Sequence, residues 1–514
     1  MKKWKILYCV LFFGLCLVPS VGMLFTEEEE SSENRELAEF PRLTTEDGAN
    51  VEWLSQAGDW FQEHFAFRNE LVTANALVNG KLLGTSTASG VIQGSSGWLY
   101  YKDSLSDYLG TEPMSDRSLF NVAHTLSMMQ ESMEEKGVKF LFAVAPNKNS
   151  LYGENMPYYY SLKVSEEKNL LRLKDFLEEE NVNYADLYEV LGSEDEVLYH
   201  KTDSHWNNKG ASIAADTLLA MVGQEHTSYE NAEYEVRADF EGDLDKMLYP
   251  LAITPDEEIY YKDAFTYEYT EEIESTFDTR IHTTNAGKTG SLVMYRDSFG
   301  NAILPFMAEN YGSAYFSRGV PYQLSDVDAN MADTLIVERA ERFLPEMAQS
   351  PPVMLAAAKA APDGVSGQWE EEMEEAGDGA LDVEMVSQGQ QVQISGRISP
   401  EYVDTETRIY VRLDGGALYE AFPMDVETDE GTDSCGFLLY LSAEALQGTD
   451  SSAAAEPQSN VSAAAEPIGN QAAAEPQSNV SAAADPVLDV FCVTDGKVVH
   501  VYRNVIKEEI QSEK

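Results

Sequence analysis

Cysteine is scarce in this chain of 514 residues, which contains four of them. No two have the close spacing of a zinc-binding pair, so a cysteine-ligated metal fold is excluded. Cys9 and Cys16 lie in an apolar run, where a thiol packs as a small hydrophobic group. Cys435 and Cys492 are far apart in the sequence, and their spacing leaves open whether they form a disulfide or stay free.

Positive charge is scarce as well. Lys and Arg number 35 against 89 Asp and Glu, which gives a formal net charge of −54. No segment offers the basic face that phosphate binding requires, so a nucleic-acid partner is excluded. The acidity extends along the whole chain, which is typical of a well-solvated extracellular surface. With 43% hydrophobic residues the chain can still form packed cores, so it is not a disordered protein.

The first 25 residues predict a membrane segment. Residues 6–25 have no charged side chain and are long enough to cross a bilayer. Lys2, Lys3 and Lys5 precede this run, which places the N-terminus in the cytoplasm and the remainder outside. We therefore expect residues 1–25 to be a signal anchor of a single-pass protein in the cell membrane. Cleavage of the segment, which would make the protein secreted, stays open.

The next part of the sequence predicts an α/β domain. A polar spacer at 26–45 leads into residues 46–350, which alternate short apolar runs with amphipathic helical segments. Residues 138–145, closed by Pro146, form a run typical of a buried strand. This alternation predicts a mainly parallel sheet flanked by helices. Ligands of such folds bind at the carboxyl ends of the strands.

The sequence changes character after residue 350. Residues 351–380 are rich in Ala, Pro, Gly and Glu and predict a linker. Residues 381–508 contain alternating strand-like segments, which predict a small β-sandwich-like accessory domain. Within it, residues 447–486 form a low-complexity insert in which Ala-Ala-Ala-Glu-Pro recurs. With so few large apolar side chains the insert cannot form a core, and we expect a removable loop between two paired strands.

Two polar segments of the α/β domain carry catalytic residue types. In the first, Asp203 and His205 are two residues apart, so an extended backbone directs both side chains to one side. A carboxylate beside an imidazole orients it and stabilises its protonated form. In the second, Ser298 follows a strand-like run and precedes a helical one, where free backbone N–H groups can bind an oxyanion. Serine needs a base to become a nucleophile, and His205 is the best one available.

Further residues near these segments are candidates for oxyanion or substrate contacts. They are Asn147, Lys148, Arg296 and Trp206. The amide of Asn147 follows a predicted buried strand at the edge where ligands bind, although an Asn in this position equally often stabilises its own loop.

A metal site is the alternative use of the first segment. His200, Asp203 and His205 offer ligand atoms, and a zinc site needs at least three. The remaining His residues are scattered through the sequence, and a metal would leave Ser298 without a role. We therefore expect neither a metal nor another cofactor.

These segments resemble a known family. Asp203-Ser204-His205-Trp206 and Arg296-Asp297-Ser298-Phe299-Gly300 are similar to motifs of the DHHW and alginate O-acetyltransferase (AlgX/AlgJ-like) branch of the SGNH hydrolases. Further similar segments are Arg35–Pro41, Glu63–Arg68, Gly97–Tyr100, Ala145–Lys148, Gly242–Leu244 and Val337–Arg339. The resemblance extends over residues 35–345. Ser204 stands where the name-giving motif has its first His, so the second His, His205, is the one expected to matter.

The resemblance implies an SGNH-like fold with Ser298 as nucleophile, His205 as base and Asp203 as the residue that orients it. It further implies acetyl transfer through an acyl-serine to sugar hydroxyls of an exported or cell-surface polysaccharide. A membrane-bound O-acyltransferase would supply the acyl group. Two alternatives stay open, namely a carbohydrate acetyl esterase with the same triad and a non-catalytic polysaccharide-binding or scaffold protein.

Overall fold

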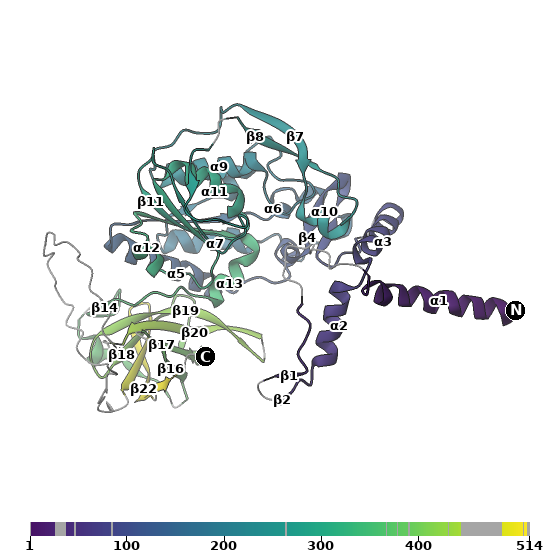
Figure 1. Ribbon diagram of the computed structural model, residues 1–514. Helices are drawn as coiled ribbons and strands as arrows, with labels where there is room; N and C mark the ends of the chain where they lie inside the picture. The colour runs from purple at the N-terminus through teal and green to yellow at the C-terminus, as the bar shows by residue number, and fades with distance from the viewer. Residues whose placement is uncertain are drawn as a thin grey trace, which may run out of the picture. The chain divides into compact units, whose positions relative to one another are not determined.

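A computed structural model describes most of the chain (Figure 1). The described residues are 2–25, 38–45, 48–83, 86–262, 265–365, 367–377, 379–388, 391–429, 431–443, 486–506 and 508–510. Residues 26–37 of the predicted spacer and almost all of the predicted low-complexity insert lie outside the described residues.

Helix α1 (Lys2–Gly22) forms where the apolar run predicts a membrane segment. Its stretch Trp4–Gly22 has a mean hydropathy of 1.9 and is long enough to span a membrane. A signal sequence and a membrane anchor both have this length and composition.

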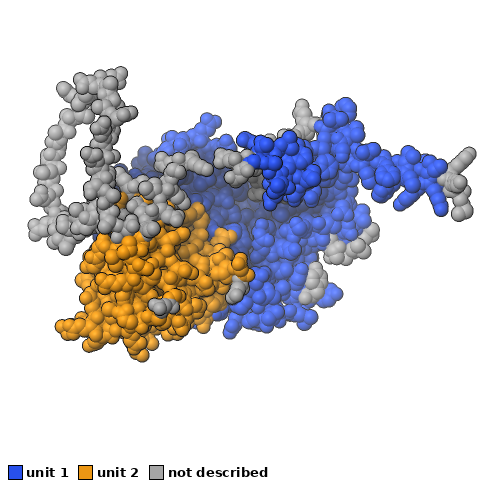
Figure 2. Space-filling model, turned by 90° about the horizontal axis from the view of Figure 1, so that it is seen from below, with its two compact units in different colours: residues 1–113, 130–319, 326–344 blue, residues 114–129, 320–325, 345–514 orange. Residues whose placement is uncertain are grey.

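The chain divides into two compact units (Figure 2). Unit 1 consists of residues 1–113, 130–319 and 326–344, and unit 2 of residues 114–129, 320–325 and 345–514.

Unit 1 is built on a sheet with strand order β6-β5-β13-β11-β12-β10-β9. The pairs from β6 to β12 are parallel, whereas β10 and β9 are antiparallel additions at one edge. The mainly parallel sheet is therefore confirmed. The strands are β5 (Lys139–Ala145), β6 (Tyr184–Ala185), β9 (Glu268–Tyr269), β10 (Arg280–Thr284), β11 (Ser291–Tyr295), β12 (Ser313–Ser317) and β13 (Thr334–Ala340).

Helices flank both faces of this sheet (Figure 1). Helices α9 and α11 lie together on one side, and α7 and α12 lie on the other. Right-handed crossovers between parallel strands produce this distribution, because β11 to β12 and β12 to β13 step in opposite directions across the sheet. The helices of unit 1 include α2 (Trp53–His64), α3 (Arg68–Leu83), α4 (Leu105–Leu109), α6 (Lys148–Leu151), α7 (Asn169–Glu179), α8 (Leu187–Gly192), α9 (Asn208–Met221), α10 (Asp243–Leu248), α11 (Gly300–Asn310) and α12 (Ser325–Ala329). Helix α13 (Leu344–Gln349) belongs to unit 2 except for its first residue.

The main core of unit 1 lies between the sheet and helices α9 and α11. Alternate residues of β5, namely Leu141, Ala143 and Ala145, are buried there, as the period of a strand requires. Short hairpins complete the unit: β1 (Thr44–Thr45) with β2 (Gly48–Ala49), β3 (Val91–Gln93) with β4 (Leu99–Tyr101), and β7 (Tyr234–Phe240) with β8 (Asp256–Tyr261).

Unit 2 is strand-rich, as predicted. Its strands form one continuous curled sheet rather than two separate ones, in the order β15-β22-β21-β18-β19-β20-β17-β16-β23. Strand β19 joins the two halves, since its first residues pair with β18 and its later residues with β20. The elements are β14 (Ala358–Lys359), α14 (Trp369–Glu372), β15 (Glu374–Glu375), β16 (Leu381–Gln388), β17 (Gln391–Ile398), β18 (Arg408–Leu413), β19 (Leu418–Thr428), β20 (Gly431–Ser442), β21 (Val487–Thr494), β22 (Lys497–Val505) and β23 (Glu508–Ile510).

The strands on either side of the low-complexity insert are not neighbours, contrary to expectation. Strand β20 lies between β19 and β17, while β21 lies between β18 and β22. The chain between them must therefore span other strands, so a deletion has to leave enough residues to do so. Cys435 on β20 and Cys492 on β21 are both buried, and the structure forms no disulfide between them.

Helix α5 (Asp116–Glu135) begins in unit 2 and ends in unit 1. Its first half supplies polar side chains to unit 2. Arg117 donates to the carbonyl oxygens of Thr405 (3.0 Å) and Thr407 (2.6 Å), and Asn121 donates to Asp425 (2.9 Å). These buried contacts explain why residues 114–129 cluster with strands almost 300 positions later.

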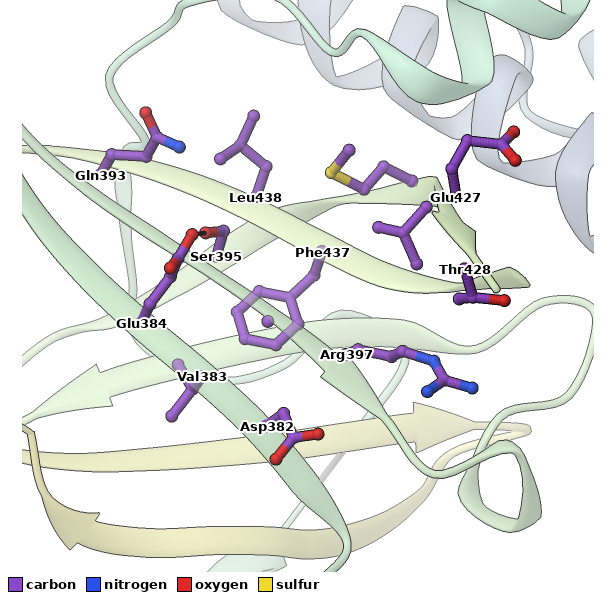
Figure 3. Close-up of a pocket in the computed structure, with 13 residues that line it drawn as sticks. Asp382, Val383, Glu384, Gln393, Ser395, Arg397, Glu427, Thr428, Phe437 and Leu438 are labelled. Carbon is purple, nitrogen blue, oxygen red and sulfur yellow. Dashed lines mark hydrogen bonds between the residues drawn. The ribbon is translucent and has the colours of Figure 1, made fainter. Parts of the chain in front are cut away.

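Unit 2 also contains a pocket of about 560 Å³ on strands β16, β17, β19 and β20 (Figure 3). Its polar lining includes Asp382, Glu384 and Ser395, and Ser395 donates to Glu384 (3.2 Å). Phe437 and Leu438 supply apolar surface. Arg397, the cation of this lining, is paired with Asp433.

Candidate active site

Ser298 lies in the turn between strand β11 and helix α11, at the carboxyl edge of the sheet. The side chain of Asp297 braces this turn: its Oδ1 accepts from the N–H of Phe299 (2.8 Å), and its Oδ2 accepts from the N–H of Ala340 (2.7 Å) at the end of β13. Glycine is required at position 300, because a Cβ there would lie 2.6 Å from the Cβ of Arg296. The serine is thus held by the two central strands.

Asp203 and His205 lie in a loop that leads into helix α9. The loop is closed by a bridge between Tyr199 and Trp206, and Asn207 caps α9 by accepting from the N–H of Gly210 (3.0 Å). Asn is among the residues preferred at this capping position, because its side-chain oxygen satisfies a free backbone N–H at the helix start.

The structure brings Ser298, His205 and Asp203 together. His205 Nδ1 is 2.7 Å from Asp203 Oδ1, and His205 Nε2 is 2.8 Å from Ser298 Oγ. A carboxylate only accepts, so the imidazole donates from Nδ1 and Nε2 is left to accept the serine proton. The His205 side chain is 17% exposed, so a molecule from solvent can reach it. The three groups have the geometry that nucleophilic catalysis by serine requires.

Asp203 and His205 each favour the charged form of the other. Burial alone would raise the pKa of Asp203. The charge of His205 and the hydrogen bonds that Asp203 accepts nevertheless hold this pKa well below its usual range. Burial lowers the pKa of His205, yet the charge and hydrogen bond of Asp203 outweigh it, so this pKa lies above its ordinary value. The imidazole is therefore a stronger base than a free histidine.

A second carboxylate, Asp243, adjoins the pair and was not among the predicted site residues. It lies at the start of helix α10, and its N–H donates to Asp203 Oδ2 (2.7 Å). It accepts from the N–H (2.8 Å) and the hydroxyl (2.6 Å) of Ser204, and its Oδ2 is 3.7 Å from His205 Nδ1. Burial and the charge of Asp203 raise the pKa of Asp243 to about 6.

A signal for Asp243 was present in the sequence. Gly242 before it approaches Thr202 so closely that a Cβ would lie 2.2 Å from the Thr202 carbonyl oxygen. Such a contact permits only glycine. The segment Gly242–Leu244 matched the family resemblance but carried no assigned role.

Lys148 points away from solvent and toward the Asp203 loop. Its ammonium donates to the carbonyl oxygens of His200 (3.0 Å), Lys201 (3.0 Å) and Asp203 (2.6 Å). These acceptors use all three N–H groups of the lysine. Lys148 thus contacts the site residues themselves, whereas its predicted contact with substrate or oxyanion remains a prediction.

Asn147 lies between β5 and α6 at the same edge of the sheet as Ser298. Its N–H donates to Glu341 Oε2 (2.7 Å), and Glu341 follows Ala340, which contacts Asp297. Its side-chain amide is buried and has no hydrogen-bond partner among the described residues. A buried amide without a partner is costly, which is consistent with a donor held ready for an oxyanion.

Arg296 and Trp206 donate hydrogen bonds within the protein, while the Nε of Arg296 is buried without a partner among the described residues. Arg296 is 1% exposed and donates to the carbonyl oxygen of Thr276 (2.9 Å) and to Asn301. Trp206 is 2% exposed and donates from its indole to the Phe299 carbonyl oxygen (3.1 Å). Both brace the turn that holds Ser298, and their roles toward substrate remain predictions.

Arg342 is a further residue that sequence reasoning missed. Its guanidinium lies over the ring of Phe299 (5.4 Å) and near that of Tyr101 (5.6 Å). Its positive charge opposes the protonation of His205 and so moderates the raised pKa of that histidine. No acidic partner of Arg342 occurs among the described residues, so its charge acts on the active site.

Asp203, His205 and Asp243 have ligand atoms within 4.8 Å of one another, the spacing of a metal site. Both nitrogens of His205 are engaged with Asp203 and Ser298, so a metal would have to break the triad geometry. His200, the third ligand considered from the sequence, is not in this group and pairs instead with Glu258 (3.0 Å). The residues present therefore fit a hydrogen-bonded triad better than a metal site.

Comparison with known proteins shows what part of this domain is similar to. Residues 91–280 match the family model described as SGNH hydrolase-like domain, acetyltransferase AlgX. The match includes Asp203 and His205 and ends before Ser298. The chain is 23% identical over 261 residues to the probable alginate O-acetylase AlgJ of Pseudomonas syringae pv. tomato. This match covers 48% of the chain and 61% of that relative's length.

Two solved structures are similar to about half of the chain. PatB1 of Bacillus cereus is 15% identical, with 49% of this chain and 96% of that one covered and a TM-score of 0.40. A DHHW family protein from Eubacterium siraeum is 20% identical, with 44% and 85% covered and a TM-score of 0.36. Over residues 91–280 the chain is therefore similar to the SGNH hydrolase-like domain of the AlgX acetyltransferase family model.

Proposed function

We propose that unit 1 transfers an acetyl group to sugar hydroxyls of an exported or cell-surface polysaccharide, through an acyl-serine at Ser298. The observation that carries the proposal is the unbroken hydrogen-bond chain from Ser298 through His205 to Asp203, with Nε2 of the histidine 2.8 Å from the serine hydroxyl. The family of the domain supports acetyl as the group transferred.

The reaction has two halves. In the first, Ser298 Oγ attacks the carbonyl carbon of the acetyl donor while its proton moves to His205 Nε2. The bond from that carbon to the donor oxygen breaks, and the histidine returns the proton to the leaving oxygen. In the second, a sugar hydroxyl gives its proton to His205 and attacks the acyl-serine, and Ser298 regains a proton as it leaves. Asp203 stabilises the imidazolium formed in each half.

Negative charge develops on the carbonyl oxygen in both halves. The N–H of Ser298 has no acceptor among the described residues, and it sits before helix α11, where backbone N–H groups favour an anion. The amide of Asn147 is the second proposed donor. Water exclusion would determine whether transfer or hydrolysis follows, since water attacking the same acyl-serine makes the enzyme an esterase.

Helix α1 supports the proposed location and the proposed donor partner. If α1 stays as an anchor, it holds the catalytic domain against the outer face of the cell membrane; if it is cleaved, the domain is secreted. An acyl donor on the cytoplasmic side cannot reach that face unaided, so we propose a membrane-bound O-acyltransferase as the donor partner. The relative named as a probable alginate O-acetylase supports a polysaccharide acceptor.

The test uses the full chain in detergent with 4-nitrophenyl acetate as donor. We expect a burst of nitrophenol and an acetyl group on the peptide that contains Ser298, both absent from Ser298→Ala. Adding soluble oligosaccharides should then divert acetyl groups from water to sugar. Labelling without any diversion across oligosaccharides would favour the esterase, and no labelling of the wild-type protein would favour the binding or scaffold alternative.

A further inference from the structure

Lys148 is an unusual lysine for its position in unit 1. It is the first residue of the short helix α6, it is 4% exposed, and its ammonium lies 5.4 Å from the ring of Trp98 and 5.2 Å from that of Tyr100. Burying an ammonium is energetically costly unless close partners compensate for its lost hydration. A buried lysine at this position therefore needs a reason.

Its hydrogen bonds all go to one loop. The three acceptors are the carbonyl oxygens of residues 200, 201 and 203, at 2.6–3.0 Å. An ammonium has three N–H groups, so donors and acceptors match in number. Charged donors form hydrogen bonds about twice as strong as neutral ones. The lysine thus replaces the backbone partners that this irregular loop lacks.

The N–H groups of the same loop are held from the other side. Asp256 Oδ2 accepts from the N–H of Lys201 (2.6 Å) and of Thr202 (3.1 Å), and Asp243 accepts from that of Ser204 (2.8 Å). Carboxylates therefore bind the donors of the loop, and the ammonium binds its acceptors. Asp203 accepts from Lys148 with its carbonyl oxygen and from His205 with its carboxylate, so the clamp acts directly on the residue that orients the base.

We propose that Lys148 is a positioning residue: by clamping the three carbonyl groups of the loop, it holds Asp203 and His205 at the distance from which His205 reaches Ser298. This rests on the proposed function. Displacements of about 1 Å at an active site can lower rates by about 100-fold, and a loop of this kind can relax by that much once its clamp is lost.

The charge state of Lys148 adds a physical requirement. Burial lowers the pKa of Lys148 to about 7, against the charges of Asp203, Asp243 and Asp256, which favour its protonation. Those three carboxylates face the lysine from the loop, from helix α10 and from strand β8. A neutral amine has two N–H groups, so one of the three carbonyls would lose its donor.

The test compares Lys148→Met with Lys168→Met in the full chain. Lys168 is a matched control, since it is also buried in unit 1 at 8% exposure, lies over an aromatic ring (5.5 Å) and donates to a single carbonyl, that of Ser150 (3.2 Å). The probe is phenylmethanesulfonyl fluoride. Its S–F bond breaks as Ser298 Oγ binds sulfur, fluoride leaves, and the serine proton passes to His205. A second readout is the downfield proton resonance of His205 Nδ1, which reports the bond to Asp203 without any reaction.

We expect Lys148→Met to slow sulfonylation by about 100-fold. It should also weaken or remove the downfield resonance at temperatures where the variant is still folded. Lys168→Met should lower the melting temperature and leave both readouts unchanged. Lys148→Gln, which keeps two N–H groups, should fall between wild type and Met, and it carries the test if the Met variant does not fold.

Wild-type sulfonylation rates and an intact resonance in Lys148→Met or Lys148→Gln would overturn the positioning role. Failure of the proposed function looks different, because the wild-type protein would then not react at Ser298 at all. The resonance would still decide the role of Lys148 in that case.

Discussion

Unit 1 and unit 2 each bury a histidine against a carboxylate, and the order of the hydrogen-bonded groups differs between the two pairs. In unit 1 the order is Ser298, His205, Asp203, with the histidine in the middle. In unit 2, Glu420 stands in the middle between His124 (3.1 Å) and Lys359. The side chain of His124 is 4% exposed, against 17% for His205.

This difference distinguishes the proposed catalytic pair of unit 1 from the structural pair of unit 2. A central histidine accepts the proton of the hydroxyl, and the carboxylate on its other side stabilises the imidazolium that forms. A central carboxylate divides its charge between two cations, which keeps the pKa of Glu420 well below its usual range despite burial. Such a cluster joins helix α5 to strands β14 and β19. A histidine beside a carboxylate is therefore evidence for catalysis only when its other nitrogen meets a nucleophile.

The largest loss of activity should come from changes in the hydrogen-bond chain of Ser298, His205 and Asp203. Ser298→Ala or His205→Ala is expected to lower kcat on 4-nitrophenyl acetate by about a million-fold, because the nucleophile or its base is lost. His124→Ala should leave kcat unchanged and lower the free energy of unfolding by about 1–3 kcal/mol, since Glu420 loses a buried partner. Denaturant titration measures the second effect. Substantial activity in Ser298→Ala would end the comparison.

Asp203 should tolerate loss better than its two partners. Removing the orienting carboxylate of a triad costs about 10⁴-fold in kcat. Asp243 Oδ2, only 3.7 Å from His205 Nδ1, can take over part of this role. We therefore expect Asp203→Asn to lose less than this and Asp203→Asn with Asp243→Asn to reach the full loss, with Asp243→Asn alone as control. Equal rates for the single Asp203 variant and the double variant would show that Asp243 does not take over the role of Asp203.

Asn147 lies at the edge of the sheet where negative charge would develop in both halves of the proposed reaction. Its unpartnered amide leads us to expect that Asn147→Ala lowers kcat by about 3 kcal/mol in activation free energy, as for removal of an oxyanion donor. The melting temperature should stay the same or rise, because a buried polar group without a partner is removed. Lost stability with normal kcat would instead assign Asn147 to its loop.

The smallest effect is a shift of the pH profile. His205 must be neutral to act as a base, and its pKa is raised above the ordinary 6.5. The value of kcat/KM should therefore rise with pH through an inflection above 6.5, and in Asp203→Asn the inflection should move down. The stability of the ionised pair has the opposite dependence: it is present below 6.5 and is lost as pH rises through the folded pKa. An inflection that Asp203→Asn leaves in place would belong to another group.

Local patterns allowed much of the fold and part of the site to be predicted. Asp203 and His205 are two residues apart, and Ser298 sits between a strand and a helix, so short-range geometry was enough to select them. Asp243 contacts Asp203 from 40 positions away, and the resemblance at Gly242–Leu244 marked its segment without assigning it a role. Lys148 likewise resembles a surface lysine until the fold buries it.

The division of helix α5 could not be predicted for a related reason. Its apolar periodicity shows that one face is buried, but it does not show which residues cover that face. The polar side chains that settle the matter, such as Asn121 and His124, find their partners on strand β19. A boundary at residue 350 therefore misses a segment of unit 2 that lies within the first third of the chain.

Helix α5 also imposes an order on biosynthesis. His124 and Glu420 are separated by 296 residues. At translation rates of about 5–20 residues per second, the first half of α5 waits roughly 15–60 s for the strand that accepts its polar face. During this interval unit 1 cannot finish folding as an independent N-terminal domain, because one of its helices is continuous with a segment whose partners do not yet exist. The nascent chain must therefore be kept from misfolding until unit 2 has emerged.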